Sequence, residues 1–154
     1  MKIRSAQPSD AQQWAAMRDL LWPDSREAHL ADIARFWAGQ SAGMVEVFVI
    51  DRQQEGQLGG FLELNVRHYA EGSDNDRVPY VEGWFVAADC RGRGWGRKLI
   101  EAAEQWAIVH GYNELASDAE MENHGSIAAH KALGFAEVDR VVCFLKPLKQ
   151  IKEG

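Results

Sequence analysis

The stretch Tyr80-Val-Glu-Gly-Trp-Phe-Val86, continued by Ala87-Ala-Asp-Cys90 and Arg91-Gly-Arg-Gly-Trp-Gly-Arg-Lys98, decides the fold of this chain. Its first part is apolar and aromatic, as is typical of a strand, and its last part is a basic, glycine-rich loop. A helical pattern of apolar residues opens directly after the loop, over residues 99–107. The stretch therefore predicts a strand, a loop and a helix in that order.

The loop has the chemistry of a phosphate-binding site. Glycine lets a backbone approach a ligand closely, because it has no Cβ. The start of a helix presents unpaired N–H groups and a positive dipole end, which together attract phosphate. Full positive charges in the loop come from Arg91, Arg93, Arg97 and Lys98. We expect a polyphosphate ligand here.

The spacing of the glycines narrows the choice of ligand. A dinucleotide fingerprint would need a third glycine where Arg97 stands, and a P-loop would need a Gly-Lys pair, which the chain lacks. What remains is the pattern Arg91-x-x-Gly94-x-Gly96 after a strand. A plain solvated turn is the alternative interpretation.

Length and composition predict one soluble globular domain. The chain has 154 residues, of which 46% are hydrophobic and 26% are charged. No apolar run approaches the length of a membrane span, and the N-terminus lacks a signal-like apolar segment, so we expect no membrane association. Cys90 and Cys143 have no metal-ligand spacing and suit free thiols in a reducing compartment, so we expect no metal and a cytoplasmic location.

The charge pattern favours a small cationic substrate. A net charge of −6 argues against nucleic acid as a partner, since that requires a broad positive surface. Acidic residues recur in 71–76, at Glu82 and in 118–122, beside the basic loop at 91–98. A negative cleft would attract cations. The alternative for the acids of 71–76 is that they only solvate a loop.

The remaining elements follow from apolar periodicity. Beyond the central stretch, strands are predicted at 2–7, 44–50, 59–66, 114–118 and 138–145, and a polar loop at 68–79. A first helix follows Pro8, a second opens at a capping box of Asp24 and Glu27, and a last one spans 125–132. The order β-α-α-β-β-β-α-β-α-β predicts an α/β or α+β mixed sheet flanked by helices. Residues 1–148 would form the single domain, with 149–154 as a frayed tail.

Two motifs carry a family resemblance. The loop at 91–96 is similar to the acyl-CoA pyrophosphate loop of the Gcn5-related N-acetyltransferase (GNAT) superfamily. The segment Asn123-(x)₆-His130-x-x-Leu133-Gly134-Phe135 resembles the second signature of that family. The resemblance implies the GNAT fold and acetyl-CoA as co-substrate. It also implies a set of cofactor-binding residues: Trp84, Phe85, Val86, Arg91, Gly92, Arg93, Gly94, Trp95, Gly96, Arg97 and Asn123.

His130 departs from the family pattern. Most members have there a tyrosine that protonates the departing CoA thiolate. A histidine can serve as this acid because its ordinary pKa lies near neutrality, or it can be an ordinary helix residue.

Closer similarity points to the aminoglycoside 6′-N-acetyltransferase branch of the family. Seven short segments carry this similarity and keep their order along the chain. They are Leu21-Trp-Pro23, Ala28-His-Leu30, Arg67-His-Tyr69, Glu82-Gly-Trp-Phe-Val86, Ala116-Ser-Asp118, His130-Lys-Ala-Leu-Gly-Phe135 and Asp139-Arg-Val141. This resemblance implies antibiotic resistance as the biological role and often a homodimer. It places at the drug site Trp22, Tyr69, Glu82, Asp118 and Asp139.

The chemistry of these residues suits a polycationic acceptor. Carboxylates form charge-assisted hydrogen bonds with ammonium groups, and aromatic faces bind cations. Glu82 is the candidate general base, directly or through water, with Asp118 assisting. An outward, solvated Glu82, a turn-capping Asp118 and a core Trp22 are the structural alternatives.

Other mechanisms and functions remain open at this point. A covalent route through Cys90 is the mechanistic rival of direct transfer in a ternary complex. A GNAT enzyme for a polyamine, a lysine or a protein N-terminus is one functional alternative. A non-catalytic acetyl-CoA-binding sensor is the other.

Overall fold

The computed structural model describes residues 1–54 and 56–151. They divide into two compact units, one of residues 1–119 and one that begins at Glu120, and each has its own architecture. Residues 152–154 of the predicted frayed tail lie outside the described residues.

The first unit contains a five-stranded sheet in the order β1-β2-β3-β4-β5. Its strands are β1 (Lys2–Ser5), β2 (Glu46–Asp51), β3 (Leu58–Arg67), β4 (Val78–Val86) and β5 (Ala116–Ser117). The first four strands pair antiparallel, and β5 alone runs parallel to its neighbour β4. The predicted mixed, mostly antiparallel sheet is confirmed.

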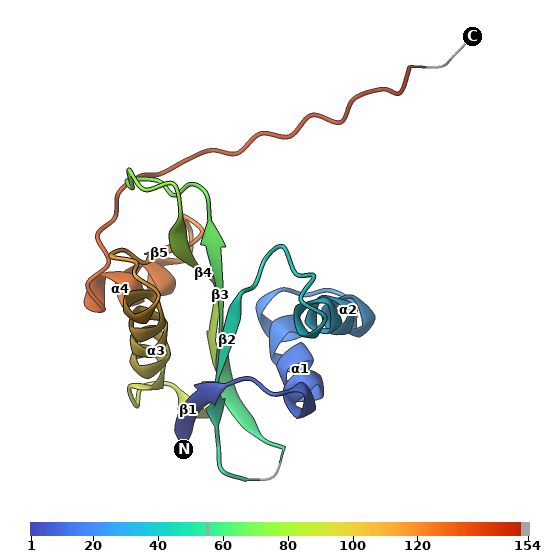
Figure 1. Ribbon diagram of the computed structural model, residues 1–154, viewed down its shortest axis with the longest axis vertical. Coiled ribbons are helices and arrows are strands. Elements are labelled where there is room, and N and C mark those ends of the chain that lie inside the picture. The colour runs from blue at the N-terminus through green and yellow to red at the C-terminus, as the bar shows by residue number, and fades with distance from the viewer. Residues whose placement is uncertain (55, 152–154) are drawn as a thin grey trace. The chain divides into compact units, whose positions relative to one another are not determined.

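Helices cover both faces of this sheet. Helices α1 (Ala11–Leu21) and α2 (Arg26–Trp37) lie on one face, and α3 (Trp95–Val109) lies on the other (Figure 1). Short 3₁₀ turns precede α1 and α3, at η1 (Pro8–Asp10) and η2 (Ala88–Cys90). The core between the sheet and α1–α2 centres on Trp14, Ile33 and Phe61, all of them at most 1% exposed.

The N-cap of α2 differs by one residue from the predicted one. The predicted capping box of Asp24 and Glu27 is replaced by Ser25, whose Oγ accepts from the backbone N–H of Ala28 at 3.1 Å. Ser25 has the extended backbone that suits an N-cap. The helix is therefore predicted correctly, but its cap is shifted by one residue.

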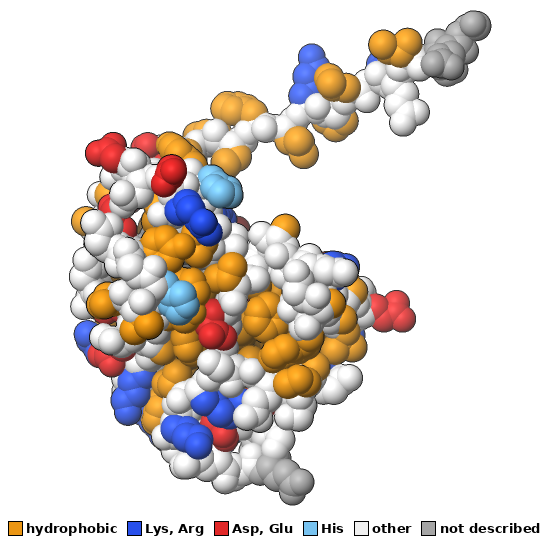
Figure 2. All heavy atoms as spheres, viewed as in Figure 1, with side chains coloured by type: hydrophobic (Ala, Val, Ile, Leu, Met, Phe, Trp, Pro, Cys, Tyr) orange, Lys and Arg blue, Asp and Glu red, His pale blue; other side chains and the backbone are white. Residues whose placement is uncertain are grey.

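The second unit contains helix α4 (His124–Ala132) and a C-terminal segment, residues 136–151, that has no regular secondary structure. The strand predicted at 138–145 is wrong for the described residues. The β-branched composition of this segment favours a strand, but a strand exists only where a neighbour supplies hydrogen-bond partners. Its apolar side chains are exposed instead, and Figure 2 shows hydrophobic side chains along this segment.

Candidate active site

Glu82 is the extra residue of a β-bulge in β4. Glu63 of β3 lies opposite Gly83, whereas the next residue of β3, Leu64, lies opposite Val81. Glu82 therefore has no partner of its own across the ladder. Bulges bend a strand and re-aim a side chain, and they are common next to active sites.

The carboxylate of Glu82 is paired with a guanidinium. Arg67 donates from Nε to Oε2 at 2.9 Å and from Nη2 to Oε1 at 2.5 Å, and Asn65 donates from Nδ2 to Oε2 at 3.1 Å. Asn65 and Arg67 alternate with Phe61 and Glu63 along β3, so they belong to the face that α1 covers. Glu82 is therefore already paired with a cation in the free protein.

A buried tyrosine connects Glu82's counter-ion with the second predicted acid. The Oη of Tyr80 donates to Oδ2 of Asp118 at 2.9 Å, and the guanidinium of Arg67 lies 3.7 Å from the centre of the Tyr80 ring. Burial and the negative charge of Asp118 raise the pKa of Tyr80 well above its ordinary value, so the hydroxyl stays protonated and donates. Glu82 and Asp118 thus belong to one polar cluster.

Trp22 lies directly against the bulge. A Cβ on Gly83 would lie 2.4 Å from Cη2 of Trp22, so only glycine leaves room for the indole. The ring also meets Phe61 edge-on, with ring centres 6.3 Å apart. Trp22 therefore packs against Gly83, the residue that follows Glu82. Tyr69 is 67% exposed on the loop after β3.

A buried polar cluster is hydrogen-bonded to the backbone of Trp22. Arg18 donates from Nε to Nδ1 of His29, so the histidine proton sits on Nε2 and is donated to the carbonyl of Trp22 at 3.0 Å. Arg18 also pairs with the buried Glu63 at 2.9 Å, and Trp14 donates to that carboxylate. This cluster fixes the end of α1 against β3.

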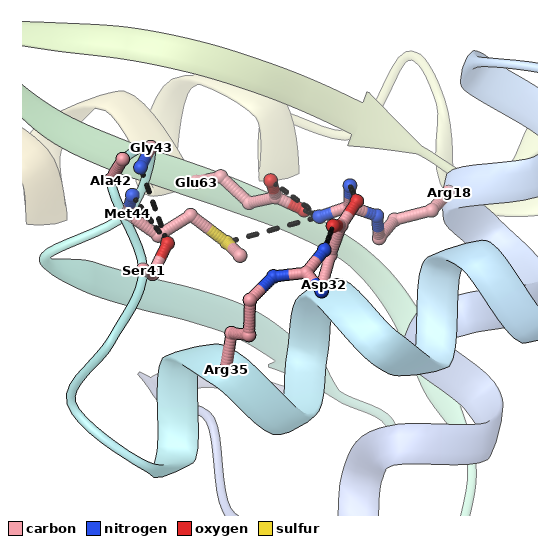
Figure 3. Close-up of a pocket in the computed structure, with 8 residues that line it drawn as sticks. All are labelled: Arg18, Asp32, Arg35, Ser41, Ala42, Gly43, Met44 and Glu63. Carbon is pink, nitrogen blue, oxygen red and sulfur yellow. Dashed lines mark hydrogen bonds and ion pairs between the residues drawn. The ribbon is translucent and has the colours of Figure 1, made fainter.

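The same cluster borders a cavity of about 270 Å³. Figure 3 shows Arg18 and Glu63 pointing toward each other, with Asp32 and Arg35 on α2 and the loop 41–44 closing one side. The charged side chains of the cavity pair with one another, since Asp32 contacts both arginines. The cavity is a structural ion-pair site, and none of the predicted site residues lines it.

The loop between β4 and α3 has the geometry of a phosphate cradle. Gly92 and Gly94 have φ angles of +74° and +83°, which other residues rarely adopt. A Cβ built on either glycine meets no other atom within 4 Å, so their backbones are open to a ligand. Helix α3 begins at Trp95, directly after the second glycine, so its first N–H groups face the same space.

The edge of β4 changes its neighbour toward this loop. The ladder between β5 and β4 contains Tyr80 and Val81, and residues 82–86 of β4 continue beyond it toward the loop. The side chains of Trp84 and Phe85 point elsewhere: the indole donates to the carbonyl of Gly96 at 3.2 Å, and Phe85 stacks on Phe61 in the core. Their backbone groups are what a ligand would meet.

Two arginines fasten the loop to the sheet. Arg91 donates from Nε to the carbonyl of Val86 at 2.8 Å. Arg52 binds Asp89 through both oxygens, at 2.7 and 2.8 Å, which lowers the pKa of Asp89 to about 2.

Cys90, the predicted alternative nucleophile, is 1% exposed beneath this turn, which disfavours a covalent route.

The second unit carries three of the predicted site residues. Asn123 is the N-cap of α4, and its Oδ1 accepts from the N–H of Ser126 at 3.1 Å. Nδ1 of His130 lies 2.7 Å from the carbonyl of Ser126, so this nitrogen carries a proton. Asp139 lies in the segment without regular structure and accepts from the backbone of its neighbour Arg140.

Three residues of the site were missed by sequence reasoning: Asn65, Arg67 and Tyr80. The alternation of polar residues at the end of β3 was the available signal for the first two. Tyr80 had no such signal in the sequence, because a tyrosine that opens an apolar strand is indistinguishable from a core residue.

Within residues 1–54 and 56–151, no cluster of three or more His, Cys, Asp and Glu side chains is arranged to hold a metal, and no helix is long and apolar enough to cross a membrane.

Comparison with known families decides the assignment of this fold. The family model described as "Acetyltransferase (GNAT) family" matches residues 14–135. The chain belongs to the GNAT acetyltransferase family. The match includes the loop at 91–96 and helix α4, the two places where the family resemblance was expected.

Individual relatives cover nearly the whole chain. An aminoglycoside N(6′)-acetyltransferase type 1 of Klebsiella aerogenes is 41% identical over 95% of this chain and 96% of its own length. The enzyme of the same name from Stenotrophomonas maltophilia is 38% identical, over 96% and 94% respectively. The predicted resemblance to this branch of the GNAT family is confirmed.

Solved structures extend the similarity to the fold. The apo aminoglycoside 6′-N-acetyltransferase AAC(6′)-IG of Acinetobacter haemolyticus superposes with a TM-score of 0.85 at 31% identity, covering 97% of this chain and 100% of its own. AAC(6′)-Iy in complex with the bisubstrate analogue CoA-S-monomethyl-acetylneamine gives a TM-score of 0.84 at 34% identity, covering 96% and 98%. The predicted GNAT fold is confirmed.

Proposed function

We propose that this GNAT enzyme transfers the acetyl group of acetyl-CoA to the 6′-amino group of aminoglycoside antibiotics and thereby confers resistance. One observation carries the proposal: Glu82 stands at the bulge of β4, on the strand that leads into the phosphate-binding loop. A carboxylate that binds cations is thus on the same strand along which an acyl chain would lie. Two relatives, both named aminoglycoside N(6′)-acetyltransferase type 1, match this chain over 96% and 94% of their own lengths, and their names support this acceptor.

Acetyl-CoA would bind along β4 and its loop. Gly92, Gly94 and Gly96 with the start of α3 would hold the pyrophosphate, assisted by the exposed arginines Arg93 and Arg97. The backbone of 84–86 would pair with the pantetheine arm as an added strand. A backbone N–H near Val86 would stabilise the negative charge that develops on the thioester oxygen.

The acceptor amine would be bound and deprotonated at the polar cluster. Glu82 takes the proton, directly or through one water, with Asp118 binding a further ammonium group. The neutral nitrogen attacks the thioester carbon and then loses its second proton to water. The carbon–sulfur bond breaks, and the thiolate leaves. Trp22, Tyr69 and Asp139 would line the remaining drug surface.

His130 would return a proton to the CoA thiolate. Because its Nδ1–H is directed at the carbonyl of Ser126, the proton for the thiolate would come from Nε2 of the cationic ring. Asn123 would contact the cofactor through its amide NH₂, since its oxygen caps α4.

Domain extent, location and assembly belong to the same proposal. We infer that residues 1–148 act as one acetyltransferase domain in the cytoplasm, as a homodimer. The exposed apolar side chains of the C-terminal segment support self-association, because large exposed apolar patches mark interaction sites.

The direct test is the variant Glu82→Gln. The rate of acetyl transfer to kanamycin, measured by the release of the CoA thiol, should fall about 10²–10⁴-fold, which is the range for loss of a general base. Circular dichroism and acetyl-CoA affinity should be unchanged. Glu46→Gln, on β2, serves as the control with normal activity.

Two results would contradict the proposal. An unchanged rate in Glu82→Gln would rule out Glu82 as the general base. Wild-type turnover of spermidine without turnover of kanamycin would rule out aminoglycosides as the acceptor. Regiochemistry is checked with an aminoglycoside that carries a 6′-hydroxyl, which should not be acetylated.

A further inference from the structure

One buried histidine links the charged cluster behind the site to a single backbone carbonyl. His29 on α2 is 3% exposed, and its Nδ1 accepts a hydrogen bond from Nε of Arg18 at 3.2 Å. Its Nε2 donates to the carbonyl of Trp22 at 3.0 Å. Asp19 lies 3.8 Å from the same nitrogen, which is beyond hydrogen-bond distance. Because a guanidinium can only donate, the ring is held as one neutral tautomer, with its proton directed at Trp22.

The carbonyl that receives this proton lies where the chain leaves α1. Trp22 is the C-cap of the helix and has an extended backbone, with φ −131° and ψ 90°. The helix therefore does not fix the direction of its peptide group. Pro23 follows and has no backbone N–H with which to form a turn hydrogen bond. The bond from His29 fixes this peptide group instead, and it ties the end of α1 to α2.

The fit of the Trp22 ring depends on this backbone. The indole lies so close to Gly83 that a Cβ there would be 2.4 Å from Cη2. It also meets Phe61 edge-on, and the guanidinium of Arg18 lies 5.2 Å from its centre. A side chain follows its own Cα–Cβ bond, so a rotation of the Trp22 backbone moves the ring out of this fit.

We propose that His29 is a positioning residue that holds the indole of Trp22 in place for the aminoglycoside. This inference rests on the proposed place of Trp22 at the drug surface. His29 does not touch the ligand and acts only through the backbone of Trp22. Its loss therefore weakens binding of the acceptor and spares acetyl-CoA, whose proposed site is β4 and the loop before α3.

The kinetic test compares His29→Leu with His29→Gln. Leucine fills the space of the ring without hydrogen-bonding groups, whereas the glutamine amide offers both an acceptor to Arg18 and a donor to Trp22. In His29→Leu the KM for kanamycin should rise about tenfold or more, a loss of about 1.4 kcal/mol in binding. The kcat and the KM for acetyl-CoA should be unchanged, as expected when only binding is lost. His29→Gln should recover most of the affinity for kanamycin.

Fluorine NMR follows the position of Trp22 without any need for activity. The protein is labelled with fluorotryptophan, and the resonance of Trp22 is identified as the one missing from Trp22→Phe. This resonance should shift and broaden in His29→Leu, because the ring is no longer held in one place. It should return close to its wild-type position in His29→Gln.

A matched variant separates positioning from a general loss of stability. Ile33 is 1% exposed and lies one helical turn after His29 on α2. Ile33→Val removes a buried methyl group and leaves the hydrogen bonds of His29 in place. It should lower the temperature of thermal unfolding and keep the wild-type KM for kanamycin.

Three results would overturn the inference. They are a wild-type KM for kanamycin in His29→Leu, an unmoved Trp22 resonance in that variant, and an equal loss of affinity in His29→Leu and His29→Gln. If His29→Leu does not fold, His29→Met is measured and judged by the same values. Failure of the proposed function looks different, because the wild type would then not acetylate kanamycin while the Trp22 resonance still shifts in His29→Leu.

Discussion

Single residues at the back of the site show how strongly the site depends on buried charge. Glu63 is 3% exposed, and burial raises its pKa above the ordinary value even though Arg18 opposes the shift. A carboxyl group with a raised folded-state pKa binds its proton more tightly when folded. Its stabilising effect is therefore full below the unfolded value of about 4.5 and is lost as the pH rises through the folded-state pKa.

Arg18→Met tests this at the residue scale. The change leaves Glu63 buried without its cation, so the free energy of unfolding at pH 7.5 should fall by about 3–5 kcal/mol. Because the pKa of Glu63 rises further, the deficit should shrink when unfolding by urea is repeated at pH 5. A deficit independent of pH would show that packing, and not the carboxylate, is responsible.

The matched change on the surface is Arg35→Met. Its partner Asp32 is shared with Arg18, and the Arg35 side chain is 54% exposed. Exposed ion pairs contribute about 0–1 kcal/mol, so this variant should unfold close to the wild type.

At the scale of elements, the loop between β4 and α3 carries the sharpest requirement. Gly94 is the N-cap of α3 and has a left-handed backbone at φ +83°. Replacing it with alanine costs about 1–2 kcal/mol in that conformation, and the loop would relax away from it.

Gly94→Ala should therefore raise the KM for acetyl-CoA by about tenfold or more, a loss of about 1.4 kcal/mol in binding. The control is Gly39→Ala, which follows α2 at φ +71° with equally open surroundings. It should lose similar stability in thermal unfolding and keep the wild-type KM. Equal KM values in both variants would contradict the cradle.

Sequence reasoning succeeded where an element is specified by its own residues. The strand–loop–helix around 80–107 has its aromatic run, its glycines and its apolar helix face in one stretch, and the structure forms it as predicted. It failed where the partner decides. The segment expected as a strand at 138–145 has β-branched residues but pairs with no strand within residues 1–54 and 56–151, and β5 is reduced to Ala116 and Ser117.

The candidate site was predicted in part for the same reason. Carboxylates such as Glu82 and Asp118 stand out in an apolar strand or at its end. The counter-ion Arg67 does not, because its contact with Glu82 depends on the bulge that places one extra residue in β4. A register shift cannot be deduced from alternation alone.

At the scale of the whole molecule, the C-terminal segment is the main candidate for self-association. Phe144, Leu145 and Leu148 are 91%, 94% and 82% exposed. Burying side chains of this size against a second copy would contribute about 1.5–3 kcal/mol each, enough to favour a dimer.

The variant Phe144→Asp tests the proposed dimer. Sedimentation of the wild type should give twice the mass of a 17.3 kDa chain, and the variant should sediment as a monomer at the same concentration. Ile108→Asp, which changes a 62% exposed residue of α3, should remain dimeric. A wild type that stays monomeric at micromolar concentration would refute the assembly.

The indole of Trp22 against Gly83 also sets how this enzyme can evolve. Since a Cβ at position 83 would lie 2.4 Å from the ring, a selection that randomises only this position should return glycine. A selection that randomises both positions together should recover alanine or serine at 83, paired with a smaller side chain at 22. With Trp22 at the drug site, as proposed above, new acceptor spectra would be reached there through coupled double substitutions, which single-step adaptation explores slowly.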